Sequence, residues 1–294
     1  MEKYSTMVKK YWMPTLLLIP GIALLVIFFV YPAISMFMNS LREINILKKT
    51  SSFIAFSNYT ALFSDALFLK GLRNTVVYVA GVTIILVPLS FIVSLLVDCC
   101  SNIGAFVRGI LYVPSIISMS IAALMWKLIL SPQIGVVGRL IESFGVQAPN
   151  FLGDPRYALA TVIGIGVWRS LGSNTILFIA GLKSMSKEQL EAAEVDGATP
   201  LQSIYHIILP NIKYVTAFVT ITTVIACFQV FTTIQVLTAG GPNNETNLLV
   251  YQVWQQGFRF YNFGMANAIS SLLFAVLFGL SLAMIRVLNK REEN

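Results

Sequence analysis

Six long apolar stretches, separated by shorter polar segments, constrain this chain more than any other feature. A helix that crosses a bilayer needs about 20 predominantly apolar residues. Only 11% of the residues are charged, whereas soluble domains carry about a quarter. Lipid is therefore the natural solvent for the excess apolar surface, and we expect an all-α, polytopic membrane bundle of six helices. The predicted spans are roughly 15–31, 75–97, 109–129, 158–182, 215–238 and 264–287.

Charge and residue types argue against several other classes of protein. The formal net charge is +7, but the basic residues form no single stripe and accompany no nucleic-acid-binding motif. Membrane flanks explain them better, so we expect no nucleic-acid partner. His206 is the only histidine, and Cys99, Cys100 and Cys227 show neither metal-ligand spacing nor a disulfide framework. We therefore expect no metal site.

The N-terminal segment bears on topology. Lys3, Lys9 and Lys10 precede the first apolar stretch and resemble the start of a signal peptide, but no small-residue cleavage site follows. We therefore expect an uncleaved first helix. An even number of spans places both termini on the same side of the membrane. Lysine and arginine are only slightly more frequent on that side, so the charge bias alone leaves the orientation open.

The loop between the fourth and fifth stretches carries strong local helix signals. Ser186 can cap a first helix, with Gln189 as its capping-box partner. Gly197 can end that helix in a left-handed turn. Thr199 can cap a second helix that has Pro200 at its first position. These signals predict two short helices joined by a tight turn, and by themselves they favour an ordinary surface hairpin.

A longer pattern in the same loop, residues 183–211, resembles the EAA loop of binding-protein-dependent ABC importers. Glu191-Ala192-Ala193 is followed by Gly197 and then by Ile207, Leu209 and Pro210, all at the family's spacing. The resemblance implies a loop that faces the cytoplasm and seats in a cleft on a separate ATPase subunit. Both termini would then be cytoplasmic. The coupling residues that it implies are Glu191, Ala192, Ala193, Asp196, Gly197, Ile207, Leu209 and Pro210.

Further motifs resemble the carbohydrate-type permeases of this group, nearer the maltose-F-like member of the pair. They are Met13-Pro14 with Tyr31-Pro32, Phe56-Ser57-Asn58-Tyr59, Val113-Pro114 with Trp126-Lys127, Trp168 at the family's distance before Glu191, and Thr238-Ala-Gly240-Gly241-Pro242 with Thr246. The resemblance implies one transmembrane domain over residues 1–294, with core spans at about 75–287, in the bacterial cell membrane. It also implies a second permease subunit, two ATP-binding subunits, an external solute-binding protein and a sugar substrate.

Missing motifs narrow the function further. The chain contains no G-x-x-x-x-G-K-[ST] loop, so we expect ATP to bind to the partner ATPase subunit and this chain to hold no cofactor. No catalytic motif is present, and we expect no enzyme activity and no catalytic residues. Ion-coupled carriers usually place acidic residues within the membrane, whereas the predicted span interiors have none. An ion-coupled carrier is thus the weaker alternative, behind a permease for a non-sugar solute such as glycerol phosphate.

Arg169 is the one charge well inside a predicted span. Such a charge is costly and suggests a functional site, although pairing with a carbonyl or reaching an interface is an equally good interpretation. The resemblance favours function, because the matching stretch lines the sugar site in maltose-type permeases. Hydroxyl and amide groups nearby suit sugar hydroxyls, while helix-to-helix hydrogen bonding is the plainer role for any one of them. The expected pathway residues are Arg169, Ser170, Ser173, Asn174, Thr223, Gln229 and Thr233.

Overall fold

The computed structural model describes residues 12, 16–45, 50–99 and 104–289, and it is predominantly helical. Within these residues, four helices are long and apolar enough to cross a membrane, and six spans result if each of two bent helix pairs counts as one. The predicted all-α membrane bundle is confirmed as a fold class. The basic residues that precede the first span lie outside the described residues.

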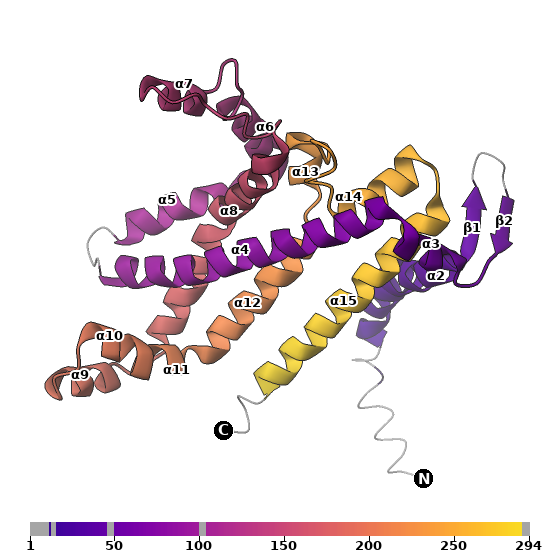
Figure 1. Ribbon diagram of the computed structural model, residues 1–294. Helices are drawn as coiled ribbons and strands as arrows, with labels where there is room; N and C mark the ends of the chain where they lie inside the picture. The colour runs from indigo at the N-terminus through magenta and orange to yellow at the C-terminus, as the bar shows by residue number, and fades with distance from the viewer. Residues whose placement is uncertain (1–11, 13–15, 46–49, 100–103, 290–294) are drawn as a thin grey trace, which may run out of the picture. The chain divides into compact units, whose positions relative to one another are not determined.

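The chain forms two compact units, residues 1–64 with 253–272 and residues 65–252 with 273–294. The first unit begins with a helical stretch over Leu16–Ser40, which extends beyond the predicted end near Tyr31. Figure 1 shows a small hairpin beside α2 and α3, which the sequence patterns did not predict. Its strands pair antiparallel, with Arg42 opposite Phe53. The elements of this unit are η1 (Val26–Val30), α2 (Tyr31–Ser40), β1 (Arg42–Asn45), β2 (Thr50–Phe53), α3 (Ser57–Ser64) and η3 (Gln255–Arg259), with the start of α15 (Phe263–Asn289).

Hydrogen bonds between distant segments hold the first unit together. The Tyr59 hydroxyl lies 2.8 Å from Ser40 Oγ and 2.7 Å from Ser271 Oγ, so it joins α3 to both α2 and α15. Asn58 Nδ2 donates to the main-chain oxygens of Ser40 and Arg42 at 2.7 and 3.0 Å. These bonds fix the start of the hairpin against α3.

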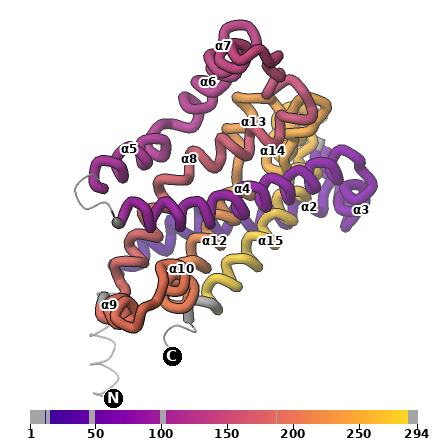
Figure 2. Tube along the Cα trace, turned by 60° about the vertical axis from the view of Figure 1, so that its left-hand side comes forward, coloured from indigo at the N-terminus to yellow at the C-terminus, as the bar shows by residue number. Residues whose placement is uncertain are grey.

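The second unit contains most of the apolar helices. Helix α8 packs against α4, α5 and α12, and α6 packs against α13. Figure 2 shows α4, α5, α8 and α12 side by side. Its helices are α4 (Ala66–Cys99), α5 (Gly104–Ile116), α6 (Met119–Ile129), α7 (Val136–Ser143), α8 (Pro155–Lys183), α9 (Lys187–Val195), α10 (Pro200–Ser203), η2 (Ile204–Ile208), α11 (Leu209–Asn211), α12 (Lys213–Phe228), α13 (Thr232–Leu237) and most of α14 (Leu249–Trp254).

Two predicted spans are not single straight helices. The third span breaks after Ile116, because Ser118 adopts an extended conformation (φ −53°, ψ 133°) and α6 leaves α5 at an angle of 97°. The fifth was expected to run to about Thr238, but α12 ends at Phe228 and α13 begins only at Thr232. Apolar composition located both stretches, but it placed the end of the fifth too far along the chain and could not reveal the breaks. The second bent pair joins Pro200–Asn211 to α12 at an angle of 71°.

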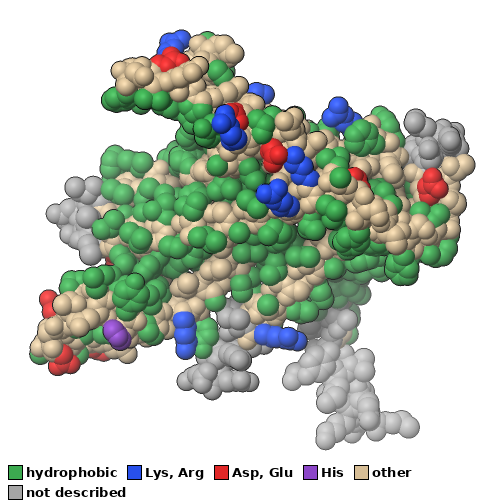
Figure 3. All heavy atoms as spheres, in the orientation of Figure 1, with side chains coloured by type: hydrophobic (Ala, Val, Ile, Leu, Met, Phe, Trp, Pro, Cys, Tyr) green, Lys and Arg blue, Asp and Glu red, His purple; other side chains and the backbone are tan. Residues whose placement is uncertain are grey.

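The second and fourth spans are continuous. Helix α4 passes through Pro88 without interruption and begins at Ala66, well before its predicted start near Thr75. Helix α8 begins at Pro155, where Asp154 caps it by accepting a hydrogen bond from the Arg156 amide. The Arg156 side chain also donates to this carboxylate, which lowers the pKa of Asp154. Hydrophobic side chains cover much of α4 and α5 on the face shown in Figure 3, as lipid contact requires.

Candidate functional site

A cavity of about 440 Å³ lies within the second unit, between α4, α8, α12 and α13. All seven residues expected to form the substrate pathway line it, although they come from distant parts of the sequence. The sequence reasoning missed other lining residues, including Tyr78, Val82, Met119 and Gly166. Tyr78 and Val82 lie four residues apart on α4 and therefore share one helix face, but an apolar face of this kind fits lipid or core contact equally well.

Arg169 lines the cavity and also binds the broken third span. Its Nη1 donates to the main-chain oxygens of Pro114 at 3.0 Å and Ile117 at 2.8 Å. The last carbonyls of a helix have no partner within that helix, so a guanidinium satisfies them well. Ser115 Oγ donates in turn to the Arg169 carbonyl at 2.9 Å. Carbonyl pairing and cavity lining, which the sequence left as alternatives, therefore occur together.

The other polar residues divide into buried and accessible groups. Asn174 Nδ2 donates to Thr223 Oγ1 at 2.9 Å, which joins α8 to α12 in the cavity wall. Thr233 is buried, whereas Gln229 is exposed at the end of α12. Ser173 Oγ donates to the Ser170 carbonyl at 3.0 Å. Hydroxyl oxygens and amide groups of this kind retain further hydrogen-bonding capacity toward a polyhydroxylated solute.

The charge that lines the cavity is positive only. Arg169 is the one charged side chain among the described residues that line it, and Asp and Glu are absent from that lining. Two of its five N–H donors bind the Pro114 and Ile117 carbonyls, which leaves those of Nε and Nη2. The cavity can therefore present hydrogen-bond donors and a positive charge to a solute, with no carboxylate to oppose an anion.

Gly172 fixes how closely α5 approaches α8. A Cβ at this position would overlap the main-chain carbonyl of Leu111, so only glycine permits the observed packing. Trp126 and Trp168 meet edge to face, with ring centroids 5.3 Å apart, on the other side of the break between α5 and α6. Backbone packing at Gly172 and the guanidinium of Arg169 together position this broken span beside the cavity.

The predicted helical hairpin is present between α8 and α12. Gly197 has φ +79°, and Thr199 forms a capping box with Gln202 at the start of α10. The capping box predicted at Ser186 with Gln189 is wrong. Ser186 Oγ instead donates to Glu188 at 2.8 Å, and Gln189 accepts from Asn211 Nδ2 at 3.1 Å. This last contact ties α9 to α11 across the base of the hairpin.

The coupling residues differ in exposure. Glu191, Ala192, Asp196, Gly197 and Pro210 are exposed, while Ala193, Ile207 and Leu209 are half-buried. Acidic side chains gather on this hairpin in Figure 3. Three large apolar side chains of the hairpin are also exposed, namely Val195 at 88%, Leu201 at 67% and Tyr205 at 65%. The sequence patterns gave no indication of this for Val195 and Tyr205. These side chains leave apolar area open on the hairpin surface.

The base of the hairpin packs into the helical bundle. Ile208 and Met185 contact a core of Phe178, Ile212 and Val219. Phe178 lies on α8, Ile212 directly precedes α12, and Val219 lies within α12. Phe178 in turn meets Phe91 of α4, with ring centroids 5.6 Å apart. Phe178 lies one helical turn from Asn174 in the cavity wall. A displacement of the hairpin base can therefore reach the cavity through packed side chains.

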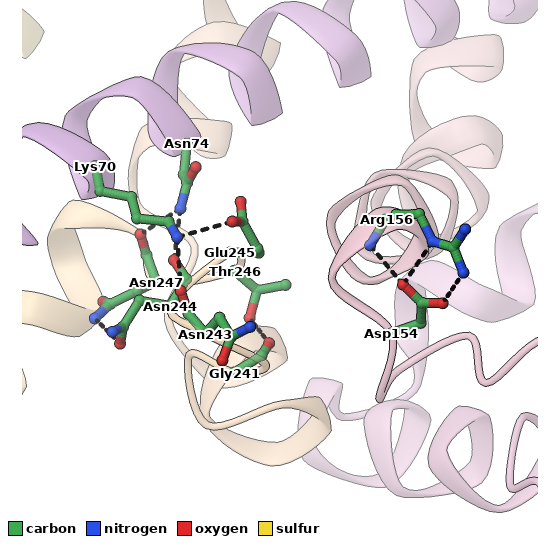
Figure 4. A network of polar contacts seen from close by, with 10 residues as sticks. All are labelled: Lys70, Asn74, Asp154, Arg156, Gly241, Asn243, Asn244, Glu245, Thr246 and Asn247. Carbon is green, nitrogen blue, oxygen red and sulfur yellow. Dashed lines mark hydrogen bonds and ion pairs between the residues drawn. The ribbon is translucent and has the colours of Figure 1, made fainter.

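The loop after α13 is anchored to the start of α4 (Figure 4). Lys70 forms an ion pair with Glu245 at 2.8 Å and donates to the Asn243 carbonyl at 2.7 Å. Asn74 Nδ2 donates to the Asn244 carbonyl at 2.8 Å. Ala239, Gly240, Asn243 and Asn244 all have positive φ angles, so these bonds hold a loop of unusual backbone conformation.

The bundle of membrane-length helices around a polar cavity, with a hairpin between two spans, defines a multi-pass membrane transport component. A family model described as "Binding-protein-dependent transport system inner membrane component" matches residues 99–293. The chain therefore belongs to this family, which confirms the membership expected from its EAA-like loop. The match covers the cavity-lining residues of α8, α12 and α13 and the whole hairpin.

Individual relatives are similar over almost the entire chain. The sn-glycerol-3-phosphate transport system permease protein UgpA of Agrobacterium fabrum is 29% identical over 281 residues, 95% of each chain. The protein of the same name from Brucella abortus is 29% identical over 280 residues, again 95% of each chain.

Solved structures show a similar fold. A chain of a bacterial ABC transporter involved in the import of the acidic polysaccharide alginate gives a TM-score of 0.84 at 23% identity, with 97% of this chain and 99% of that chain covered. A chain of a bacterial alginate ABC transporter in complex with a periplasmic protein that holds an alginate pentasaccharide gives 0.83 at 23% identity, with 95% and 94% covered. These likenesses show the fold.

Proposed function

We propose that this chain is a permease subunit of an ATP-driven, binding-protein-dependent importer of a sugar or sugar-like solute. The observation that carries the proposal is the convergence of Arg169, Asn174, Thr223 and the other pathway residues on one cavity. Polar donors and acceptors within an otherwise apolar bundle suit a solute with many hydroxyl groups. The relatives named for glycerol phosphate and alginate transport support a solute of this kind.

This role implies the other subunits of the transporter. A second permease subunit completes the pore, two ATP-binding subunits supply energy, and an external solute-binding protein delivers the solute. Both termini and the hairpin lie in the cytoplasm of a bacterial cell whose cytoplasmic membrane holds all six spans. The two structural units act together as one transport domain.

The hairpin of α9 and α10 is the docking element for the ATPase subunit in this proposal. Exposed acidic groups such as Glu191 and Asp196 offer acceptors to basic or N–H donors of the partner. Val195, Leu201 and Tyr205 supply apolar area that docking would bury. The packed base at Ile208 and Ile212 then carries ATPase movement to α8.

A second candidate substrate class is an anionic solute such as glycerol phosphate. The Nε and Nη2 donors of Arg169 have no hydrogen-bond partner among the described residues, and the described lining residues contribute no carboxylate. Guanidinium groups bind phosphate and carboxylate oxygens strongly. Neutral sugars and anionic solutes are therefore both candidate substrates for this cavity, and a transport assay decides between the two classes.

ATP-dependent uptake tests the proposal. The chain would be reconstituted into proteoliposomes with its second permease and ATPase subunits, and uptake of labelled neutral sugars, uronate oligosaccharides and glycerol 3-phosphate would be measured with the binding protein present. We expect uptake of at least one of these solutes that requires ATP. Transport without ATP, or transport driven by a proton or sodium gradient, would refute the assignment. Glu191→Lys is a useful companion variant and should reduce recovery of the ATPase subunit with the membrane pair.

A further inference from the structure

A second polar cavity, of about 390 Å³, lies within the first structural unit and has no part in the proposed pathway. The β-hairpin, α3 and the turn between η3 and α15 enclose it. Its lining combines aromatic rings with side chains that accept or donate hydrogen bonds. The lining residues are Glu43, Ile44, Ile54, Ser57, Asn58, Ala61, Phe260, Tyr261 and Asn262.

Two aromatic side chains at this cavity are open to solvent. Phe260 is 54% exposed and Tyr261 is 48% exposed. Tyr261 has φ +56°, a conformation that is rare for a bulky residue and costs free energy. Backbone bonds from Phe260 N to Gln255 O and from Asn262 N to Gln256 O, at 2.9 and 2.7 Å, hold the turn on both sides. The fold therefore maintains a strained turn that presents two rings at the cavity.

Polar groups with spare capacity surround these rings. Asn58 is only 6% exposed, and its Nδ2 is fixed by the Ser40 and Arg42 carbonyls. Its amide oxygen has no hydrogen-bond partner within the described part of the chain. Asn262 Oδ1 accepts a hydrogen bond from Met265 N at 3.2 Å, which fixes the side-chain amide. Its Nδ2 has no hydrogen-bond partner within the described part of the chain. Glu43 adds an exposed carboxylate.

The charge of the lining restricts the ligand. Glu43 is the one charged side chain that lines the cavity in the described structure, and Lys and Arg are absent from that lining. Arg259 lies nearby but stacks over the Phe260 ring, with Cζ 5.9 Å from the ring centroid. A phosphate or uronate would meet the Glu43 carboxylate, and no described residue of the lining supplies a cation to compensate it. A neutral polyhydroxylated ring fits better, because its apolar face can stack on an aromatic ring while its hydroxyls bond to the carboxylate and the amides.

We infer that this cavity is a second solute-contact site, which binds a neutral saccharide on the external side of the membrane. The external location of the cavity rests on the proposed function, in which both termini of the chain are cytoplasmic. The site differs in charge from the cavity at Arg169, so the two sites select solutes on different grounds. A neutral sugar satisfies both cavities, whereas an anionic solute suits only the cavity at Arg169.

Hydrogen–deuterium exchange of the full complex in lipid nanodiscs, without the binding protein, tests this inference. The probes are maltose, cellobiose, lactose and melibiose, with digalacturonate and glycerol 3-phosphate as anionic comparators. We expect at least one neutral disaccharide to slow exchange over residues 254–262 and both anions to leave it unchanged. Phe260→Ala should weaken that protection about five- to tenfold, as loss of one ring contact predicts. Phe258→Ala is the matched control, because Phe258 is 65% exposed in the same segment but does not line the cavity.

Three outcomes would overturn the inference. These are the absence of protection by every neutral disaccharide, equal effects of the Phe258 and Phe260 substitutions, and protection that appears only in a parallel sample to which the binding protein is added, which would mark a protein-docking surface. The ATP-dependent uptake assay distinguishes this failure from failure of the proposed function. Normal uptake with no protection over 254–262 removes only the second site. Protection by a disaccharide without ATP-dependent uptake keeps a saccharide site and removes the transport assignment.

Discussion

Arg169 Nη1 donates a hydrogen bond of 2.8 Å to the main-chain oxygen of Ile117, at the break between α5 and α6. The same nitrogen donates to Pro114 O, so one guanidinium satisfies two carbonyls that the broken helix leaves without partners. An intramembrane cation thus has a structural partner and still borders the cavity. The cost of placing a charge in the span is offset partly by bonds to its own protein.

Arg169→Ala should therefore affect both stability and transport. The Pro114 and Ile117 carbonyls lose their donor; an unsatisfied buried group costs about 1–3 kcal/mol, and these half-buried carbonyls should cost the lower part of that range. Arg169→Lys should restore function only in part, because an ammonium lacks the planar fork that reaches two carbonyls. Thermal unfolding of the purified permease pair and ATP-dependent uptake would be measured together. A fully stable, fully active Arg169→Ala variant would contradict this account.

Gly172→Ala should disrupt packing between α5 and α8. The added methyl group would overlap the Leu111 carbonyl, and backbone on both sides limits relaxation. Overpacking of this kind costs roughly 1–3 kcal/mol. Gly164→Ala is the control on the same helix, because a Cβ there meets nothing within 4 Å. We expect lower thermal stability and membrane abundance for Gly172→Ala alone, and equal behaviour of the two variants would argue against close packing at Gly172.

Gly197→Val should uncouple the ATPase while leaving the membrane bundle folded. Gly197 has φ +79° and open space around it, so the penalty comes from backbone strain, on the order of 1–2 kcal/mol. The strained hairpin would present a changed angle to the ATPase cleft. Co-purification of the ATPase subunit and sugar uptake should both fall.

Gly145→Val provides the comparison for this strain. Gly145 has φ +77° and equally open surroundings, but it follows α7 and lies outside the hairpin. It should leave ATPase recovery unchanged. If Gly197→Val retains wild-type recovery and uptake, the hairpin is not the coupling element.

Asn74→Ala should destabilise the loop after α13 more than Lys70→Met does. Asn74 is only 3% exposed and donates to the Asn244 carbonyl and, at 3.4 Å, to the carbonyl of the buried Asn247, so its loss removes both hydrogen bonds from the loop. The Lys70–Glu245 pair is about one-third exposed on each side, and such pairs contribute only about 0–1 kcal/mol. Limited proteolysis of residues 239–247 in the two variants measures the difference, and greater cleavage in Lys70→Met would reverse the predicted order.

The site was partly readable from the sequence. Arg169 is conspicuous as a charge within an apolar stretch, and Ser170, Ser173 and Asn174 follow it on the same helix. The Tyr78 contribution could not be predicted, because an aromatic residue on an apolar helix meets lipid, core and cavity with equal plausibility. The exposure of Val195 and Tyr205 was also hidden, since a hydrophobic residue in a short helix is ordinarily buried.

The sequence by itself determined the membrane class, the six apolar stretches and the hairpin turn at Gly197. These depend on local quantities, namely the length of apolar runs and the φ angle that glycine permits. Only the tertiary structure decided that the third span breaks at Ser118, that Gly172 contacts the Leu111 backbone and that Arg169 bonds to Ile117. Those features depend on which helices meet, and helix pairing is set by packing between residues far apart in the chain.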